Sequence, residues 1–379
     1  MKRHGQLFQK ILDETNIRQA LHTACLSNGR TSPAKRRAIQ NVRANPDEYV
    51  QKVRDILCDY HTSKYSVFPL YDPKLRFIYA LPFDPDRLAH HALLNVLAPI
   101  WDGKFAPFSY ACRKGYGQHK AGLLCSAYTR RYKYCAQFDI SQFYVSINHE
   151  ILKQVLRRKL KDIKVLAILD EIIDSISTRD KNLEILYRMK AQGFKHKDIE
   201  REIRKLELSK ARDNGAKAGV PVGSFTSQWF GNLFMNENDG FLIQTLGCHA
   251  VVRYCDDFLV FSNDKTFLQR VKEAEQAYLW KHLHLILSKA EIFPTSHGVD
   301  FCGYRFFPEG YALLRRRTAK SQRKQLRRIQ HGLATGRMTH LDAQHRLASM
   351  DGWLRWAQCH NWKMHNGFYE AKSEAFRDS

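Results

Sequence analysis

The 379-residue sequence predicts a mixed α/β (α+β) fold arranged as two or three lobes. Apolar stretches rich in β-branched and aromatic residues predict strands at 131–139 and 251–261, and both stretches contain aspartates. Helical periodicity at 87–101, 149–160 and 223–246 predicts helices before and between them. A hydrophobic fraction of 44% is sufficient for a buried core, so a globally disordered chain is not expected.

The first 100 residues divide into three predicted elements. Residues 1–60 are polar and basic with helical spacing in places, which predicts an N-terminal helical extension. Residues 65–83 alternate aromatic and β-branched residues around Asp72-Pro73, so a hairpin is expected, with Lys74 and Arg76 at its basic tip. Residues 87–101 predict a buried helix because their pattern is almost wholly apolar.

The later elements carry more charge. Residues 149–160 predict an amphipathic helix, and residues 178–213 predict a helical insertion that is mostly solvated. The pair Asn263-Asp264 is expected to cap a helix whose apolar face includes Phe267 and Val271.

The charge balance indicates a polyanionic partner. The chain has 61 Lys and Arg residues against 38 Asp and Glu residues, a formal net charge of +23. No acidic residue occurs from Gly310 to Leu341, and residues 315–328 predict a basic helix suited to binding phosphates. A charged, solvated face is the alternative interpretation of this helix.

The nine cysteines indicate neither a disulfide framework nor a zinc module, because the number is odd and no C-x-x-C occurs. No stretch approaches about 18 consecutive apolar residues, and the N-terminus lacks an apolar core typical of a signal peptide. We therefore expect no membrane partner and a reducing cytoplasmic location.

The stretch "RYCDDFLVFS" at 253–262 places Asp256 and Asp257 in a tight turn between two strand-forming runs. Adjacent carboxylates repel each other unless a cation neutralises them. Asp139 ends the strand at 131–139, and pairing of the strands would bring it to Asp256. Hard oxygen ligands in this arrangement suit two Mg²⁺ ions about 4 Å apart, with Mn²⁺ as an alternative. A surface turn is the alternative for an isolated Asp-Asp pair.

A series of motifs, in order from about residue 60 to 360, resembles those of reverse transcriptases. "FDISQFYVSI" resembles the first palm motif of that family, and "GVPVGSFTSQWFGN" resembles its glycine-rich motif. "YCDD" resembles the Y-x-D-D box, "LILSKAEI" the motif that follows it, and "FCGYRF" the primer grip. The basic segment 310–379 resembles a short thumb.

The resemblance implies a right-hand polymerase with fingers, a palm whose antiparallel sheet carries the carboxylates, and a short helical thumb. Fingers and palm would occupy residues 61–305, with 178–213 as an insertion, and the basic thumb would occupy 306–379, after the extension at 1–60. It implies RNA-directed DNA polymerase activity, which makes cDNA by two-metal nucleotidyl transfer. The implied partners are an RNA template, a DNA or RNA primer, and dNTPs.

The resemblance also implies three groups of site residues. The catalytic and metal-binding group is Asp139, Asp256 and Asp257, with Ile140 as a further metal ligand. The nucleotide-binding group is Lys74, Arg76, Tyr144, Val222, Gly223, Gln228 and Lys289. The primer- and template-binding group is Phe301, Gly303, Tyr304, Arg316, Arg323 and Arg327. Tyr144 falls where an aromatic ring blocks a 2′-hydroxyl, which implies a preference for dNTPs; packing in the core is the alternative.

The glycine-rich motif departs from the usual Q-G-x-x-x-S-P pattern, because Val222 replaces the Gln and Gln228 replaces the Pro. This pair of changes resembles bacterial or phage-encoded diversity-generating retroelement enzymes. Those enzymes copy a template RNA with errors at adenines, together with a small basic accessory protein. The insertion at 178–213 leaves room for a related group, the antiviral defence-associated reverse transcriptases that copy a structured non-coding RNA. A catalytically dead RNA-binding scaffold is the alternative from a different class; intact Asp139, Asp256 and Asp257 speak against it.

Overall fold

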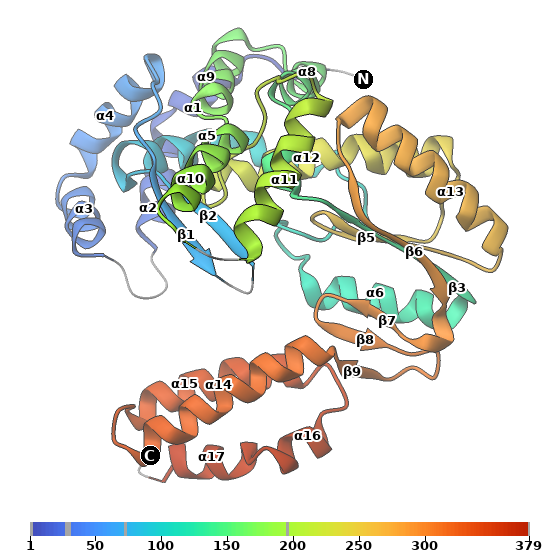
Figure 1. Ribbon diagram of the computed structural model, residues 1–379. Helices are drawn as coiled ribbons and strands as arrows, with labels where there is room; N and C mark the ends of the chain where they lie inside the picture. Colours follow the sequence, from blue (N-terminus) through green and yellow to red (C-terminus); the bar gives the residue numbers. More distant parts are fainter. Residues whose placement is uncertain (1–2, 27–31, 72–73, 195–196, 378–379) are drawn as a thin grey trace. The chain divides into compact units, whose positions relative to one another are not determined.

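The computed structural model describes residues 3–26, 32–71, 74–194 and 197–377, and the chain forms two compact units (Figure 1). Unit 1 consists of Met1–Pro107, Ile140–Gly247 and Ala274–Ser288. Unit 2 consists of Phe108–Asp139, Cys248–Glu273 and Lys289–Ser379. Each unit is therefore built from stretches that are far apart in the sequence. The predicted division into residues 1–60, 61–305 and 306–379 stays a prediction.

Unit 1 is mainly helical and contains one two-stranded hairpin. Its helices are α1 (Leu7–Leu12), α2 (Glu14–Cys25), α3 (Pro33–Ala44), α4 (Pro46–Cys58), α5 (Leu88–Asp102), α7 (Phe143–Ser146), α8 (His149–Lys159), α9 (Ile163–Asp174), α10 (Thr178–Ala191), α11 (Lys197–Arg212) and α12 (Phe225–Gly240). The hairpin consists of antiparallel β1 (Ser66–Tyr71) and β2 (Leu75–Ala80). Short turns labelled η1 (Phe83–Arg87), η2 (Phe241–Thr245) and η3 (Leu279–Leu283) complete the unit.

Side-chain caps fix where several of these helices begin. Asp13 accepts hydrogen bonds from the backbone N–H groups of Thr15 and Asn16 at the start of α2. Asn148, Asp162 and Ser177 do the same at the starts of α8, α9 and α10. Each such cap satisfies a backbone donor that has no partner inside its helix.

The predicted insertion is helical, as expected, and most of its described residues are exposed or partly exposed, but one side of it is buried. Apolar side chains of α10 and α11 are buried against the hairpin in one cluster, which consists of Leu75, Phe77, Tyr79, Leu183, Leu186, Ile199, Ile203 and Leu206. Helix α11 is amphipathic, and most charged residues of the two helices lie on the outer faces, with the buried Arg179 of α10 as an exception. The sequence did not indicate this buried side, because the strand that covers it, β2, lies far earlier in the chain.

Unit 2 is built on the sheet that carries the aspartates. Its strands are β3 (Tyr134–Ile140), β4 (Val251–Tyr254), β5 (Asp257–Ser262) and β6 (Leu287–Pro294), in the spatial order β4-β5-β3-β6. A second sheet, in the order β7-β8-β9, consists of β7 (Val299–Phe301), β8 (Tyr304–Phe306) and β9 (Ala312–Leu314). Helix α6 (Gln118–Arg131) belongs to this unit, and α13 (Lys265–Tyr278) begins in it. The short turn η4 (Thr295–His297) connects β6 and β7.

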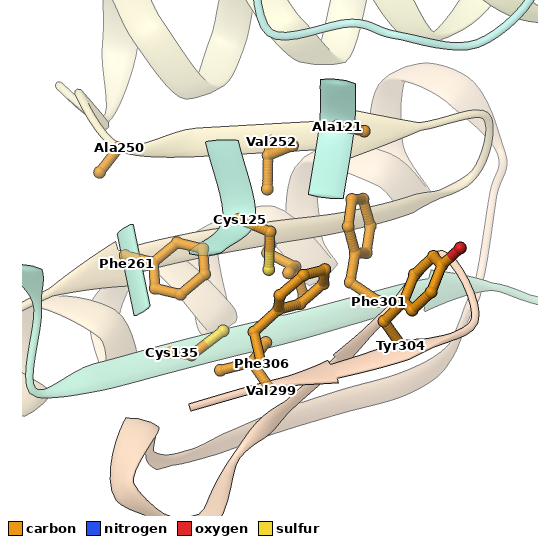
Figure 2. Packing of buried hydrophobic residues seen from close by; sticks show 11 residues of the cluster. Ala121, Cys125, Cys135, Ala250, Val252, Phe261, Val299, Phe301, Tyr304 and Phe306 are labelled. Carbon is orange, nitrogen blue, oxygen red and sulfur yellow. The ribbon is translucent and has the colours of Figure 1, made fainter. Parts of the chain in front are cut away.

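One apolar core joins the two sheets of unit 2 to α6. Figure 2 shows its side chains gathered from α6, β3, β4, β5, β7 and β8. The helix approaches closely at Gly122, where an added Cβ would lie 3.0 Å from Cζ of Phe306. The core therefore fixes the sheet that carries the carboxylates against two supporting layers.

The C-terminal residues form four helices with a core of their own. These are α14 (Arg316–Ala334), α15 (His340–Leu354), α16 (His360–His365) and α17 (Phe368–Ala375). Leu326, Ile329, Leu347 and Phe368 are buried among them. The predicted basic helix is therefore present as α14, and its apolar side packs in this core.

Most of the predicted elements are present in the structure. The apolar helix expected at 87–101 is α5, and the long helix expected at 223–246 is α12 followed by η2. The hairpin is present, although the Asp72-Pro73 turn lies outside the described residues. The helix cap differs in one detail: Asp264 accepts the N–H groups of Thr266 and Phe267, whereas Asn263 accepts the N–H of Lys133. No described helix combines the length and the apolar character needed to span a membrane.

Unit 1 buries a carboxyl group whose ionisation opposes folding. Glu275 of α13 has 0% exposed surface, and burial raises its pKa from 4.5 to about 8, with the nearby Asp239 carboxylate acting in the same direction. Between these values the folded protein binds more protons than the unfolded chain. Stability should therefore fall as the pH rises from about 4.5 to about 8, and this loss should level off above that range.

We predict that Glu275→Gln stabilises the protein at pH 8 by about 2–4 kcal/mol and has little effect at pH 4.5, because the amide has no charge to desolvate. Denaturant unfolding of both proteins across this pH range measures the difference. The control is Glu273→Gln, on an exposed position of the same helix. Identical pH profiles for Glu275→Gln and wild type would contradict the prediction.

Candidate active site

Three aspartates lie together at one edge of the β4-β5-β3-β6 sheet. Strands β3 and β5 are antiparallel, and in their register Asp139 is directly opposite Asp257. Asp256 precedes Asp257 in the turn between β4 and β5. The predicted pairing of the two strands is confirmed. The expected partner of Asp139 was Asp256, however, and the residue opposite it is Asp257, because the turn consists only of Cys255 and Asp256, and Asp257 is already the first residue of β5.

The turn that carries Asp256 is held in an unusual backbone conformation. Cys255 has a φ of 56°, in the left-handed region that residues with a Cβ rarely adopt. The guanidinium of Arg253 is fully buried, and its Nη1 donates a hydrogen bond of 2.9 Å to the carbonyl oxygen of Cys255. A cation from β4 thus supports the turn from beneath.

The segment that precedes α6 borders β4 on its outer side. The N–H of Arg253 donates to the carbonyl of Phe108 (2.9 Å), and the N–H of Tyr110 donates to the carbonyl of Arg253 (3.0 Å). The thiol of Cys112 interacts with the thiol of Cys255, which lowers the pKa of Cys112. The segment that precedes α6 therefore contacts β4 and the Y-C-D-D turn.

Burial and neighbouring negative charges both raise the pKa of Asp257. The surrounding protein raises the pKa of its carboxyl to about 7, and the charges of Asp139 and Asp256 add to this rise. A hydrogen bond from Gln137 and the positive charge of Arg315 act in the opposite direction. A divalent cation binds the ionised carboxylate, so a cation and a proton compete for this group near neutral pH.

A relay of polar side chains orients Asp257. Nε2 of Gln137 lies 3.5 Å from Oδ1 of Asp257 and 3.1 Å from the carbonyl oxygen of Asp300, to which it donates. Oε1 of the same Gln137 accepts a hydrogen bond of 2.8 Å from Nζ of Lys289, which also pairs with Glu291 at 3.2 Å. The structure thus places Lys289, a predicted nucleotide-binding residue, one side chain away from the aspartates.

The donor set suits divalent cations that prefer oxygen ligands. Among the described residues, no group of three or more His, Cys, Asp or Glu side chains is arranged to enclose a metal ion by itself. Mg²⁺ does not require such a cage in enzymes of phosphoryl transfer, because one or two carboxylates suffice when substrate phosphates and water complete the shell. Asp139, Asp256 and Asp257 fit that requirement, and Ile140 follows Asp139 at the end of β3.

Sequence reasoning missed three residues that shape this edge, namely Gln137, Arg253 and Arg315. Gln137 was detectable, because a residue two positions before Asp139 in a strand lies on the same face. Arg253 was also detectable as a cation inside an apolar strand run, which must find a buried partner. The contribution of Arg315 depends on tertiary structure, and we know of no sequence signal for it.

Several predicted nucleotide-binding residues lie together in unit 1. The ring of Tyr144 packs beside Gly231, where an added Cβ would lie 3.1 Å from Cε1 of the ring. The carbonyl of Val222 accepts a hydrogen bond of 2.8 Å from the N–H of Tyr79 in β2. Gly223 has a φ of 111°, and a Cβ there would meet the backbone of the same strand at 3.0 Å. Only glycine fits this position without strain.

The remaining predicted residues of unit 1 are exposed. Gln228 lies on the exposed side of the first turns of α12, and Lys74 and Arg76 lie at and beside the hairpin tip with their side chains exposed. Arg76 is opposite Leu70 in the hairpin register. These positions are accessible to a ligand, and their roles stay predictions.

The residues predicted to form a primer grip are divided between the core and the surface. Phe301 and Tyr304 are buried in the core of unit 2, and the hydroxyl of Tyr304 donates to the carbonyl of Trp353 at 3.0 Å. Gly303 lies in the turn between them with a φ of 89°. The two aromatic side chains therefore support this turn from below, and the turn itself is partly exposed.

The basic residues of α14 form one stripe. The stripe borders a surface hollow of about 520 Å³ and contains Lys320, Arg323, Lys324, Arg327, Arg328 and His331. Arg316 lies one turn before Lys320 on the same side of the helix. Arg323 is tethered, because its Nε donates to Oδ1 of Asn366 at 2.7 Å. The three predicted arginines thus point to the same side, opposite the apolar base of the helix.

The sequence from residue 72 to residue 306 matches the reverse transcriptase (RNA-dependent DNA polymerase) family, which is more than half of the chain. The chain belongs to this family. The predicted fold class, a mixed fold of the right-hand polymerase type with an antiparallel sheet carrying the carboxylates, is thereby confirmed.

The reverse transcriptase is similar to Protein YkfC of Escherichia coli (strain K12), with 24% identity over 299 residues, which cover 68% of this chain and 70% of that protein. It also resembles two telomerase structures. One is apo telomerase from Candida tropicalis, truncated from its C-terminal domain (13% identity, TM-score 0.39, 66% of this chain). The other is telomerase from Candida albicans with a fragment of telomeric RNA (12% identity, TM-score 0.41, 87% of this chain). This reverse transcriptase spans 54% and 61% of those two chains.

We predict that replacing Arg316, Arg323 and Arg327 together by alanine weakens binding of a primer–template duplex and flattens its salt dependence. The loss of about three phosphate contacts should reduce the slope of log K against log salt by roughly 2–3 units. Fluorescence anisotropy at several salt concentrations measures the slope.

The control for this experiment removes the same charge elsewhere. Alanine at Lys265, Arg270 and Lys272 of α13 leaves the α14 stripe intact and should change the slope little. If both triple variants behave alike, α14 is a solvated helix and not a phosphate-binding one.

Proposed function

We propose that this reverse transcriptase makes cDNA from an RNA template by two-metal nucleotidyl transfer. The observation that carries the proposal is the placement of Asp139 opposite Asp257, beside Asp256, at one sheet edge of a chain that belongs to the reverse transcriptase family. Carboxylates held close together in a partly buried site favour a bound cation, and burial together with the charges of Asp139 and Asp256 raises the pKa of Asp257 to about 7.

Asp139, Asp256 and Asp257 would hold two Mg²⁺ ions, or Mn²⁺, with the help of the Ile140 backbone. Such ions, when bound, stabilise the attacking and leaving oxygens of an in-line phosphoryl transfer. The protein supplies the orientation of the carboxylates. Gln137 of β3 lies against the Asp257 carboxylate, and Arg253 of β4 bonds the carbonyl of Cys255, so both would help to orient the oxygen ligands before an ion binds.

The other predicted residues would bind the substrates. The exposed cations Lys74 and Arg76 suit the triphosphate of an incoming dNTP, and Val222, Gly223 and Gln228 would border that nucleotide. Lys289 would act through Gln137 or on a phosphate. The partly buried ring of Tyr144 suits steric rejection of a 2′-hydroxyl. The turn at Gly303 and the α14 stripe would bind the primer–template duplex, in which the primer is DNA or RNA.

For the biological role, we propose error-prone cDNA synthesis in a bacterial or phage-encoded diversity-generating retroelement, with a small basic accessory protein. Val222 and Gln228 support this role, because they replace the usual Gln and Pro of the family. The alternative is antiviral defence with a structured non-coding RNA as template. The insertion at 178–213 favours that alternative.

We predict that Asp139→Asn and Asp256→Asn each reduce dNTP incorporation at least about a hundredfold, because an amide supplies a poorer metal ligand and removes a needed charge. Extension of a primer on RNA with Mg²⁺ measures the loss, and RNA binding should be retained. The matched control is Asp264→Asn in the same unit, since asparagine also caps a helix. Activity within tenfold of wild type in either variant would contradict the two-metal site.

We predict that Val222→Gln lowers misincorporation opposite template adenine by several-fold, with little change opposite other bases. A glutamine offers a hydrogen bond of about 1 kcal/mol that valine lacks, and such a bond changes a selection ratio only several-fold. Sequencing of the products from one RNA template measures the error rate. If the wild-type enzyme already copies adenine as accurately as the other three bases, the diversification role fails and the defence role takes its place.

A further inference from the structure

The helical insertion α10–α11 contacts every nucleotide-binding element proposed in unit 1 except Gln228. Its apolar faces share a core with β2, the strand that leads away from Lys74 and Arg76. Its first turn contacts the segment that leads to Val222. A fully solvated insertion would make no such contacts, and most of them involve buried side chains.

The first connection runs through Tyr79 of β2. Its hydroxyl donates to Oδ1 of Asn182 in α10 and lies 3.5 Å from the carbonyl oxygen of Thr178. Its N–H donates to the carbonyl of Val222. Burial raises the pKa of Tyr79, so its hydroxyl remains a donor at every working pH. One residue thus ties the hairpin both to the insertion and to the glycine-rich motif.

The second connection runs through the backbone before that motif. The N–H of Val220 donates to the carbonyl of Tyr144 at 2.9 Å. On the other side, the N–H of Thr178 at the start of α10 donates to the carbonyl of Gly219 at 3.3 Å. Gly219 has a φ of 97°, and an added Cβ would lie 2.2 Å from Oγ1 of Thr178. The segment is therefore clamped between α10 and the backbone of Tyr144.

The third connection is a buried ion pair. Arg179 of α10 has 0% exposed surface, and its Nη1 donates to Oδ2 of the buried Asp213 at 2.6 Å. Its Nη2 donates to the carbonyl of Ala216. On the facing helix, Oε2 of Glu202 accepts a hydrogen bond of 2.6 Å from Gln142, two residues before Tyr144. Loss of one partner of a buried pair is costly, so these groups hold the loop strongly.

We infer that α10–α11 positions the nucleotide pocket, with Tyr79 and Arg179 as its positioning residues. Through buried contacts and hydrogen bonds, the insertion fixes the positions of the hairpin, the backbone of Tyr144 and the carbonyl of Val222. None of its own side chains needs to touch the nucleotide. Nucleotide affinity and sugar selection should therefore depend on the hydrogen bonds that join α10–α11 to the hairpin and to the segment before Val222. The inference rests on the proposed dNTP-dependent activity.

The test removes a single hydroxyl group, that of Tyr79. Tyr79→Phe keeps the ring in the core but loses the donor to Asn182, so the hairpin and the glycine-rich motif lose a shared anchor. We expect KM for dNTPs to rise about three- to tenfold and the preference for dGTP over GTP to fall by a similar factor, with kcat and RNA binding little changed. Tyr144→Ala serves as the positive control for lost sugar selection.

The matched control is Tyr65→Phe. The ring of Tyr65 meets that of Tyr79 edge-on at 6.1 Å in the same cluster, but its hydroxyl is bonded to Ser175 and not to α10. This variant should lose similar stability and keep wild-type KM and sugar preference. If Tyr79→Phe and Tyr65→Phe give the same kinetics, the inference is overturned, and the insertion is only structural.

A double-variant cycle separates positioning from general loosening. Asn182→Ala alone should resemble Tyr79→Phe, and the double variant should be no worse than either single one, because all three lack the same bond. Additive losses in KM would contradict the inference. A wild-type protein that incorporates no dNTP on any RNA template would overturn the proposed function itself, an outcome distinct from equal kinetics of the two Tyr variants in an active enzyme.

Discussion

Repulsion among Asp139, Asp256 and Asp257 is the constraint around which unit 2 is organised. The register of β3 and β5 places two of these carboxylates opposite each other, and a slip of one residue would turn Asp139 to the other face of the sheet. The register is held by the alternation of buried residues that pack under α6 and the second sheet. The apolar core therefore stabilises an arrangement that electrostatics alone would oppose.

The protein offsets part of that repulsion with polar groups placed one layer away from the carboxylates. Gln137 donates toward Asp257 and is itself held by Lys289, while the buried Arg253 supports the turn through a backbone carbonyl. None of these groups neutralises the site, since the pKa of Asp257 remains near 7. A divalent cation at the proposed metal site would neutralise this charge, and its binding would stabilise the folded state that carries the ionised carboxylates.

The sequence was sufficient to predict elements whose patterns are local. The strands around "YCDD", the apolar helix α5 and the basic helix α14 follow from periodicity within one window. The residue opposite Asp139 could not be predicted in this way, because the two-residue turn, with Cys255 in the left-handed conformation, makes Asp257 the first residue of β5. Burial of α10 and α11 also could not be predicted, since Ile199 and Ile203 are covered by a hairpin distant in sequence. Both the residue opposite Asp139 and the burial of α10 and α11 are determined by contacts with segments distant in sequence.

Arg315 joins the catalytic edge to the basic helix that follows it. Its N–H donates to the carbonyl of Gly303, its guanidinium lies 3.5 Å from the Asp300 carboxylate, and its charge lowers the pKa of Asp257. The next residue begins α14, whose stripe carries the cations proposed for duplex binding. Because one residue contacts the turn at Gly303, influences the aspartates and starts the helix, a displacement of α14 by bound duplex would change the field at Asp257. If α14 and the aspartates have the roles proposed for them, binding of the duplex and the affinity of the site for cations would be electrostatically linked within unit 2.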